Sequence, residues 1–148
     1  LDKVITYKKF TKKINRLKNK TIKWLKEQKK KGKLVVGYGA STKGNVLLQY
    51  YNITQDLLPY IADRMPAKHG LVTVGTEIPI ISEDEMRKMK PDYLFVFIWH
   101  FRKEIIELEY EYINNGGKLI FPLPRLHIVD KSNYKFYLNS DFDDLAFS

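Results

Sequence analysis

The stretch Leu34-Val35-Val36-Gly37-Tyr38-Gly39-Ala40-Ser41-Thr42-Lys43-Gly44-Asn45 decides the fold of this chain. It begins with a short apolar run, which is typical of a buried strand, and breaks at two glycines separated by one residue. A Lys-Gly pair follows, and then the apolar segment 46–51, which contains no helix breaker. We therefore expect a strand, a tight glycine turn and a helix, in that order.

The same turn is a candidate anion site. Backbone N–H groups at the start of a helix lie at the positive end of its dipole and can bind a phosphate. Glycines let the backbone approach the anion closely, and Lys43 adds a full positive charge. The alternative is a turn that only packs the strand onto the helix, but such a turn does not need Lys43. The candidate residues are Gly37, Tyr38, Gly39, Ala40, Ser41, Lys43, Gly44 and Asn45.

The composition fits one folded domain. The chain has 148 residues, of which 44% are apolar and 14% aromatic, enough to build a core. It contains no cysteine, which excludes a disulfide framework, a thiolate zinc site and a cysteine nucleophile. No apolar run approaches the roughly 20 residues of a membrane span, and the lysine-rich start lacks the apolar core of a signal peptide. We expect a cytoplasmic protein.

Basic residues are concentrated at the start of the chain. Residues 1–33 hold 14 of the 26 basic residues and two acids, a net charge of +12, whereas residues 34–148 carry −3. Side chains at steps of three and four from Thr6 to about Lys31 predict an amphipathic helix with Gly32 as its C-cap. Its narrow apolar stripe comprises Phe10, Ile14, Leu17, Thr21, Trp24, Leu25 and Gln28.

Three interpretations of this basic helix remain open. It packs against the domain, or against a preceding domain, and keeps its lysines in water. A nucleic-acid arm would place aromatic side chains between the basic ones for base stacking, but here they lie on the apolar stripe. An anionic membrane surface would attract the same pattern. We expect the first, with neither nucleic acid nor membrane as a partner.

The rest of the chain alternates strands and helices. Strands are expected at residues 34–38, 57–62, 93–98 and 118–121. Helices are expected at residues 42–52, 83–90 and 101–115, the second opened by a capping box of Ser82 and Glu85. This order predicts an α/β fold: a Rossmann-like parallel sheet with helices on both faces, preceded by the long amphipathic helix. The expected division is 1–33 for the helix, 34–130 for the domain and 131–148 for a C-terminal tail.

Ligands bind such sheets at the carboxyl ends of the strands. Asp63 and Arg64 end the second strand, and an acid at that position takes ribose hydroxyls in dinucleotide-binding units. Trp99 and His100 end the most apolar strand, and residues 122–125 follow the last one. A solvated turn residue is an equally good interpretation of Asp63. His100 fits a general base, but a lone histidine more often only satisfies a hydrogen bond.

The connection from Met65 to Ile81 is long and irregular, and such loops tend to be functional. Lys68 and His69 are the polar residues in it that could reach a ligand at the sheet edge. An ordinary surface histidine explains His69 equally well.

These stretches together resemble the C-terminal domain of S-adenosylmethionine-dependent sugar-nucleotide C-methyltransferases, which add a methyl group to a carbon of a deoxysugar carried on a nucleoside diphosphate. The resemblance covers about residues 10–127. The matching pieces are Gly37-Tyr38-Gly39-Ala40-Ser41-Thr42-Lys43-Gly44-Asn45, Asp63-Arg64-Met65-Pro66-Ala67-Lys68-His69-Gly70, Gly75-Thr76-Glu77-Ile78-Pro79-Ile80, Pro91-Asp92-Tyr93 through Trp99, and Gly116-Gly117-Lys118 with Pro122-Leu123-Pro124.

The resemblance implies a nucleotide-sugar-binding role for residues 34–130. A family member looks like a zinc-binding piece, a central S-adenosylmethionine domain and this third domain. We therefore expect no cofactor here and no catalytic residue, with zinc and S-adenosylmethionine in the missing domains. The implied partners are a nucleoside-diphosphate sugar and the preceding S-adenosylmethionine-binding domain. His100 and His69 depart from the family, which more often has Asn and Gln there, so sugar specificity can differ.

Two other functions remain open. One is an NAD(P)-type dinucleotide-binding domain of a dehydrogenase or epimerase, although Thr42 replaces the third glycine of that fingerprint. The other is a non-catalytic interaction module, in which the glycine turn is structural and the Lys-rich helix binds the partner.

Overall fold

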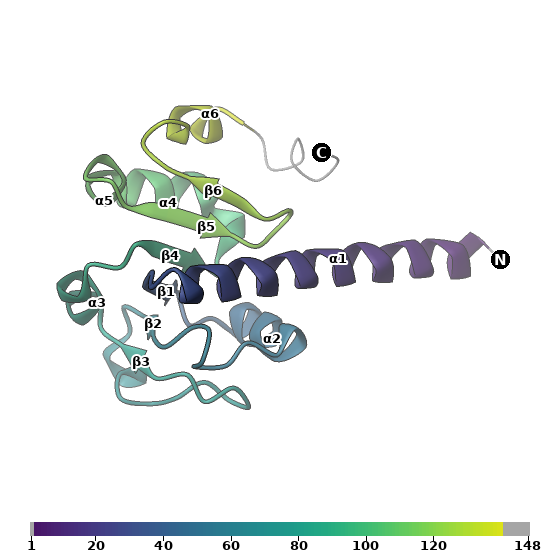
Figure 1. Cartoon of the computed structure of the whole chain (residues 1–148), viewed down its shortest axis with the longest axis horizontal. Helices are drawn as coiled ribbons and strands as arrows, with labels where there is room; N and C mark the ends of the chain where they lie inside the picture. Colours follow the sequence, from purple (N-terminus) through teal and green to yellow (C-terminus); the bar gives the residue numbers. More distant parts are fainter. Residues whose placement is uncertain (1, 141–148) are drawn as a thin grey trace.

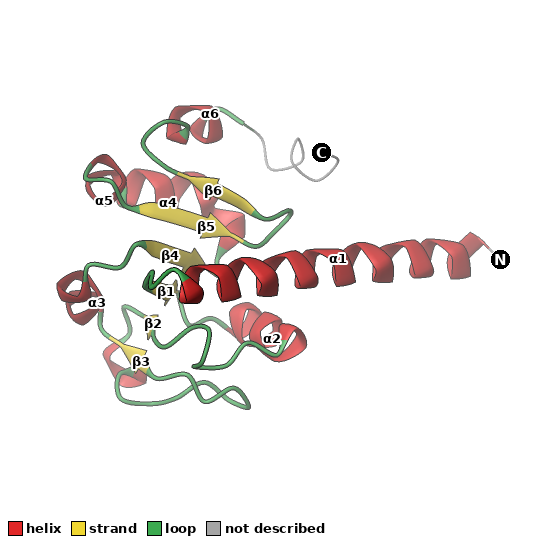
Figure 2. Cartoon of the chain, in the orientation of Figure 1, coloured by secondary structure: helices red, strands yellow, loops and turns green. Residues whose placement is uncertain are grey.

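The computed structural model describes residues 2–140 (Figure 1). Strands form a central sheet and helices lie around it (Figure 2). The helices are α1 (Asp2–Lys30), α2 (Thr42–Tyr51), α3 (Glu83–Met89), α4 (Arg102–Leu108), α5 (Tyr110–Asn114) and α6 (Tyr134–Leu138), with 3-10 turns η1 (Pro66–Lys68) and η2 (Trp99–Phe101). The strands are β1 (Val35–Tyr38), β2 (Ile61–Ala62), β3 (Ile80–Ile81), β4 (Tyr93–Val96), β5 (Lys118–Phe121) and β6 (His127–Val129).

The six strands form one sheet in the order β3-β2-β1-β4-β5-β6. All neighbours from β3 to β5 are parallel, and β6 pairs antiparallel with β5. The strand order reverses between β1 and β4, because the chain first builds outward to β3 and then returns to the other side of β1. In doubly wound sheets this switch point opens a crevice at the carboxyl ends of the strands.

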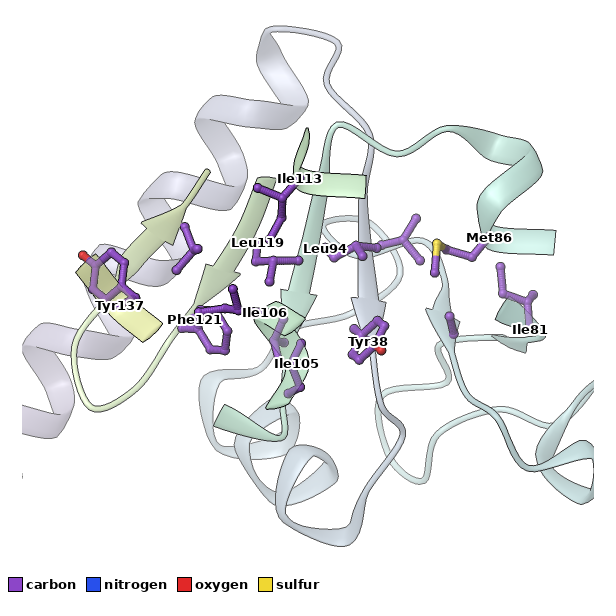
Figure 3. Packing of buried hydrophobic residues seen from close by; sticks show 14 residues of the cluster. Tyr38, Ile81, Met86, Leu94, Ile105, Ile106, Ile113, Leu119, Phe121 and Tyr137 are labelled. Atoms are coloured by element: carbon purple, nitrogen blue, oxygen red, sulfur yellow. The ribbon is translucent and has the colours of Figure 1, made fainter. Parts of the chain in front are cut away.

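Side chains of the central strands alternate between two cores. Val35 of β1 packs with α1 and α2 on one face of the sheet, where Leu25 and Leu48 are fully buried. Val36 and Tyr38 point to the other face, which α3 to α6 cover (Figure 3). Burial on both faces is the reason that a parallel strand reads as a continuous apolar run.

The helix α1 is only partly packed. Its buried positions Leu17, Thr21, Leu25 and Gln28 follow the predicted stripe, and Gly32 ends the helix with a φ of 73°. The N-terminal half extends beyond the other elements (Figure 1), and Phe10, which was expected on the buried stripe, is 61% exposed.

The predicted fold class is confirmed, with differences in detail. The capping box is also confirmed, since Ser82 Oγ accepts a hydrogen bond from the Glu85 amide. The strand expected at 57–62 is limited to Ile61–Ala62, and β3 and β6 were not predicted. The helix expected at 101–115 breaks at Glu109, which separates α4 from α5. No helix within residues 2–140 is long and apolar enough to cross a membrane.

Candidate functional site

The loops after β1, β2, β4 and β5 meet at the carboxyl edge of the sheet, as parallel pairing requires. The turn after β1 and the η2 turn after β4 flank the switch point, because β1 and β4 are neighbours in register from Val35–Tyr93 to Tyr38–Val96. The edge therefore brings the predicted glycine turn beside Trp99 and His100. The loop after β2 adds Asp63.

The glycines of the turn have different tasks. Gly39 has a φ of 88°, a conformation that side-chain-bearing residues rarely adopt. A Cβ on Gly37 would lie 2.7 Å from Ile61 Cγ1 and from the Phe97 ring, and a Cβ on Gly44 would lie 2.7 Å from Phe97 Cβ. Gly37 thus leaves room on β1 for the Ile61 and Phe97 side chains, and Gly44 lets α2 pack closely against Phe97. Both serve packing, which is the structural interpretation of this motif.

Most amides of the turn are bonded within the protein. The Gly39 amide donates to Ala62 O, Ala40 to Asp63 Oδ2, Ser41 to Gly39 O, Gly44 to Ser41 Oγ and Asn45 to Ser41 O. In the described part of the chain, the amides of Thr42 and Lys43 have no hydrogen-bond partner. These two amides at the start of α2, together with the exposed Lys43 ammonium, are the donors left for an anion.

One buried acceptor lies beside these donors. The Oδ1 atom of Asn45, in the first turn of α2, is buried and has no partner among residues 2–140. A buried polar atom without a partner is costly, and it is usually satisfied by water or a ligand.

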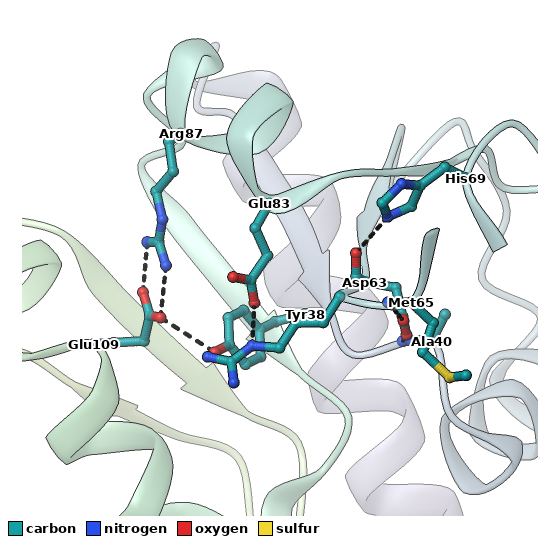
Figure 4. Close-up of polar contacts among 9 residues, drawn as sticks. Tyr38, Ala40, Asp63, Met65, His69, Glu83, Arg87 and Glu109 are labelled. Atoms are coloured by element: carbon teal, nitrogen blue, oxygen red, sulfur yellow. Dashed lines mark hydrogen bonds and ion pairs between the residues drawn. The ribbon is translucent and has the colours of Figure 1, made fainter. Parts of the chain in front are cut away.

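Asp63 organises the edge (Figure 4). Its carboxylate is 10% exposed and accepts hydrogen bonds from Ala40 N and Met65 N, both at 2.8 Å. Lys68 Nζ donates to Ala40 O at 2.8 Å and lies 3.7 Å from Asp63 Oδ2. His69 Nε2 lies 2.7 Å from Asp63 O, and because a carbonyl only accepts, this nitrogen carries the proton. The predicted residues Asp63, Lys68 and His69 are thus brought together as partners of one another.

Two other predicted residues also have protein partners. Arg64 pairs with Glu83 at 2.9 Å, and its side chain is largely exposed. Tyr38 is buried on the α3–α6 face, where its hydroxyl donates to Glu109, and Arg87 binds the same carboxylate through both terminal nitrogens (Figure 4). Burial and then the charge of Glu109 raise the pKa of Tyr38, so its side chain stays neutral. Its side chain supports the core behind the edge.

The η2 turn carries aromatic rings to the edge after β4. The ring of His100 lies 5.5 Å from that of Trp99 and 4.4 Å from that of Phe101, measured between centroids, and His100 is exposed. Such a cluster offers flat surfaces on which a sugar or base can lie.

A second polar cluster, not predicted from the sequence, lies after β4 and β5. Arg102 is buried at the start of α4, Arg125 follows β5, and His127 belongs to β6. His127 Nδ1 donates to Arg125 O at 2.7 Å, so its Nε2 is an acceptor and faces Arg102 Nη1 at 3.3 Å. Burial, with the nearby arginine charges, lowers the pKa of His127 to about 4. No signal in the sequence predicted that Arg102, a charged residue directly after Trp99-His100-Phe101, would be buried.

Comparison with known proteins identifies the family to which the chain belongs. The model of the C-methyltransferase C-terminal domain matches residues 1–124. The chain belongs to this family. It is also 36% identical over 98 residues to the C-methyltransferase NovU of Streptomyces niveus, a match that covers 66% of this chain and 23% of that protein. The chain therefore spans about a quarter of the length of this curated relative.

A cavity of about 570 Å³ lies at the opposite edge of the family domain, where β4 and β5 begin. Lys33, Lys90 and Lys118 line it together with Arg87, which is already paired with Glu109. The two lysines at 33 and 90 are exposed to solvent, so water stabilises their charges. We therefore place the candidate site at the carboxyl edge.

Replacing Asp63 tests its role as the organiser of this edge. Asp63→Ala leaves the amides of Ala40 and Met65 without their acceptor, so we expect a loss of about 1–3 kcal/mol in the free energy of unfolding, measured by urea denaturation. Asp56→Ala, at an exposed turn, is the control and should change stability by less than about 0.5 kcal/mol. Equal stability of the two variants would show that Asp63 organises nothing.

His127 predicts a pH dependence of stability. Its folded pKa of about 4 lies below the ordinary value of 6.5, so the unfolded chain binds the proton more tightly. The stabilisation that comes from keeping His127 neutral is fully present above about pH 6.5 and is lost as the pH falls toward 4. At pH 5 the free energy of unfolding should be lower by about 2 kcal/mol for this reason. His127→Phe should remove this part of the pH dependence in urea denaturation, and His100→Gln should retain it. The same pH dependence in His127→Phe would refute the assignment.

Proposed function

We propose that this chain is the nucleotide-sugar-binding domain of an S-adenosylmethionine-dependent C-methyltransferase that acts on a deoxysugar nucleotide. Family membership supports the C-methyltransferase part. The observation that carries the binding role is the open start of α2 at the switch point, where the amides of Thr42 and Lys43 have no partner among the described residues. A nucleoside diphosphate carries about two negative charges, and such a helix start favours them.

The other residues of the edge take complementary roles in this proposal. Lys43 neutralises a phosphate oxygen as a point charge. The free lone pairs of Asp63 accept from a sugar or ribose hydroxyl, because each carboxylate oxygen accepts more than one hydrogen bond. Trp99 and His100 provide a wall for a ring, and Arg64 and His69 lie at the rim. Tyr38 contributes only through its backbone and the core.

Methyl transfer itself belongs, in this proposal, to the preceding domains of the same cytoplasmic polypeptide, which supply S-adenosylmethionine, zinc and the catalytic base. The contribution of this domain is to hold and orient the nucleotide-sugar. The projecting half of α1 supports a preceding partner domain, since Val4, Ile5, Tyr7 and Phe10 are all exposed there. Apolar side chains that share an exposed helix segment commonly mark an interaction surface.

Ligand protection tests the proposal. Thymidine diphosphate (dTDP) should raise the thermal unfolding midpoint of the 148-residue chain, because a ligand that binds only the folded state stabilises it. Lys43→Ala should weaken dTDP binding by about 1.5–2 kcal/mol, the lower part of the range for a charged hydrogen bond, because the lysine is exposed. Lys20→Ala, on α1, removes an exposed charge elsewhere and should leave dTDP affinity unchanged.

NAD distinguishes the principal alternative, because the strand order is that of dinucleotide-binding folds. Protection by NAD and not by dTDP would replace the proposal with a dehydrogenase or epimerase domain. If neither dTDP nor NAD raises the thermal unfolding midpoint, the non-catalytic interaction module is the hypothesis that remains.

A further inference from the structure

Two arginines at the carboxyl edge have buried guanidinium atoms without partners. Arg102 is only 4% exposed, and its Nε has no hydrogen-bond partner among residues 2–140. The Nε of Arg125 is likewise buried and without a partner in this part of the chain. Arg102 otherwise contacts the lone pair of His127 Nε2 at 3.3 Å, the carbonyl of Ser140 at 3.4 Å and the face of the Tyr137 ring.

Neither of these two arginines has a carboxylate partner within residues 2–140. Arg64, Lys68 and Arg87 each pair with a described carboxylate, whereas Arg102 and Arg125 pair with none of them. Burial lowers the pKa of Arg102, and the positive charge of Arg125 lowers it further. Taking a charge out of water without a counter-charge costs several kcal/mol, so buried charges are normally paired.

The neighbouring histidine cannot supply the missing negative charge. His127 is neutral, donates from Nδ1 to Arg125 O and directs a lone pair at Arg102. Its ring is held between Phe121 and Tyr137, with centroid distances of 5.2 and 5.1 Å. It therefore positions Arg102 and connects it to the Arg125 backbone, while both Nε–H groups stay without a partner in the part of the chain that the structure describes.

We propose that Arg102 and Arg125 form a binding site for a phosphate-type oxyanion. The guanidinium group presents planar, parallel N–H donors that match phosphate oxygens, and two such groups suit a doubly charged ligand. Arg102 follows β4 and Arg125 follows β5, so the site lies at the ligand-binding edge and next to the switch point. Neighbouring strands are about 4.8 Å apart, so roughly 10 Å separates the ends of β1 and β5, within the span of a nucleotide-sugar.

The identification of this oxyanion as the diphosphate of a nucleotide-sugar rests on the proposed function; the site itself does not. One other source of oxyanions exists in the sequence. Asp141 follows Ser140 directly, Asp143 and Asp144 come shortly after it, and all three lie outside the described residues. The experiment must therefore separate a phosphate ligand from the carboxylates of the chain.

Inorganic pyrophosphate is the probe, titrated calorimetrically into the 148-residue chain at low ionic strength. Arg102→Gln and Arg125→Gln should each weaken its binding by about tenfold or more, as expected for the loss of a charge-assisted hydrogen bond. Lys135→Gln, which removes an exposed charge on α6, should change the affinity less than twofold. Without ligand, Arg102→Gln should not lower the thermal midpoint, because it removes a buried charge that has no counter-charge among residues 2–140.

Unchanged pyrophosphate affinity in both arginine variants would overturn the proposal, as would an affinity that depends on Lys43 alone. The variant Asp141→Asn/Asp143→Asn/Asp144→Asn tests the other source of oxyanions. If the natural chain does not bind pyrophosphate and this variant unfolds at a lower temperature, the arginines pair with the chain's own carboxylates and the proposal fails. Arginine-dependent pyrophosphate binding without dTDP binding would support the site and contradict the nucleotide-sugar function. Binding of dTDP that neither arginine substitution affects would support the nucleotide-sugar function and contradict the arginine site.

Discussion

The carboxylate of Asp63 is the constraint on which the carboxyl edge of this sheet depends. It accepts the amide of Ala40 in the turn after β1 and the amide of Met65 in the loop after β2, both at 2.8 Å. Lys68 closes the arrangement by donating to Ala40 O. These contacts tie together two loops from neighbouring strands. Preorganisation of this kind lowers the entropy that binding must otherwise overcome.

The same constraint decides which groups remain for a ligand. Because the glycine turn uses most of its amides internally, it is not a complete anion cradle. Among residues 2–140, the donors without a partner lie to either side: the amides of Thr42 and Lys43 at the start of α2, and the Nε–H groups of Arg102 and Arg125 after β4 and β5. The glycines themselves serve close packing and a left-handed turn. Cationic groups therefore lie on both sides of the switch point.

The sequence predicted the parts of the fold that have strong local signals. The apolar runs at Val35–Tyr38 and Tyr93–Val96, the glycine turn and the capping box at Ser82 depend on neighbouring residues, and all four were confirmed. The two-residue strand β3 is too short to show a period, and β6 depends on pairing with β5. The break between α4 and α5 falls at Glu109. Its side chain bonds to Arg87 of α3 and Tyr38 of β1, which are distant in the sequence, so no local pattern indicated the break.

The site follows the same division. Parallel topology was enough to place Asp63, Trp99 and His100 at one edge. The burial of Arg102 was not predictable, because β6 and α6 pack over it and neither was foreseen. The internal bonding of Asp63, Lys68 and His69 was equally hidden, since these residues form contacts that only the folded loops create.

The most direct test of the central claim is a titration of the ¹⁵N-labelled 148-residue chain with dTDP, followed in amide correlation spectra. We predict that the largest shift changes fall at the carboxyl edge, on Thr42 and Lys43 and on residues around Arg102, Arg125 and His127. Changes confined to the opposite edge, around Lys33, Lys90 and Lys118, would contradict it.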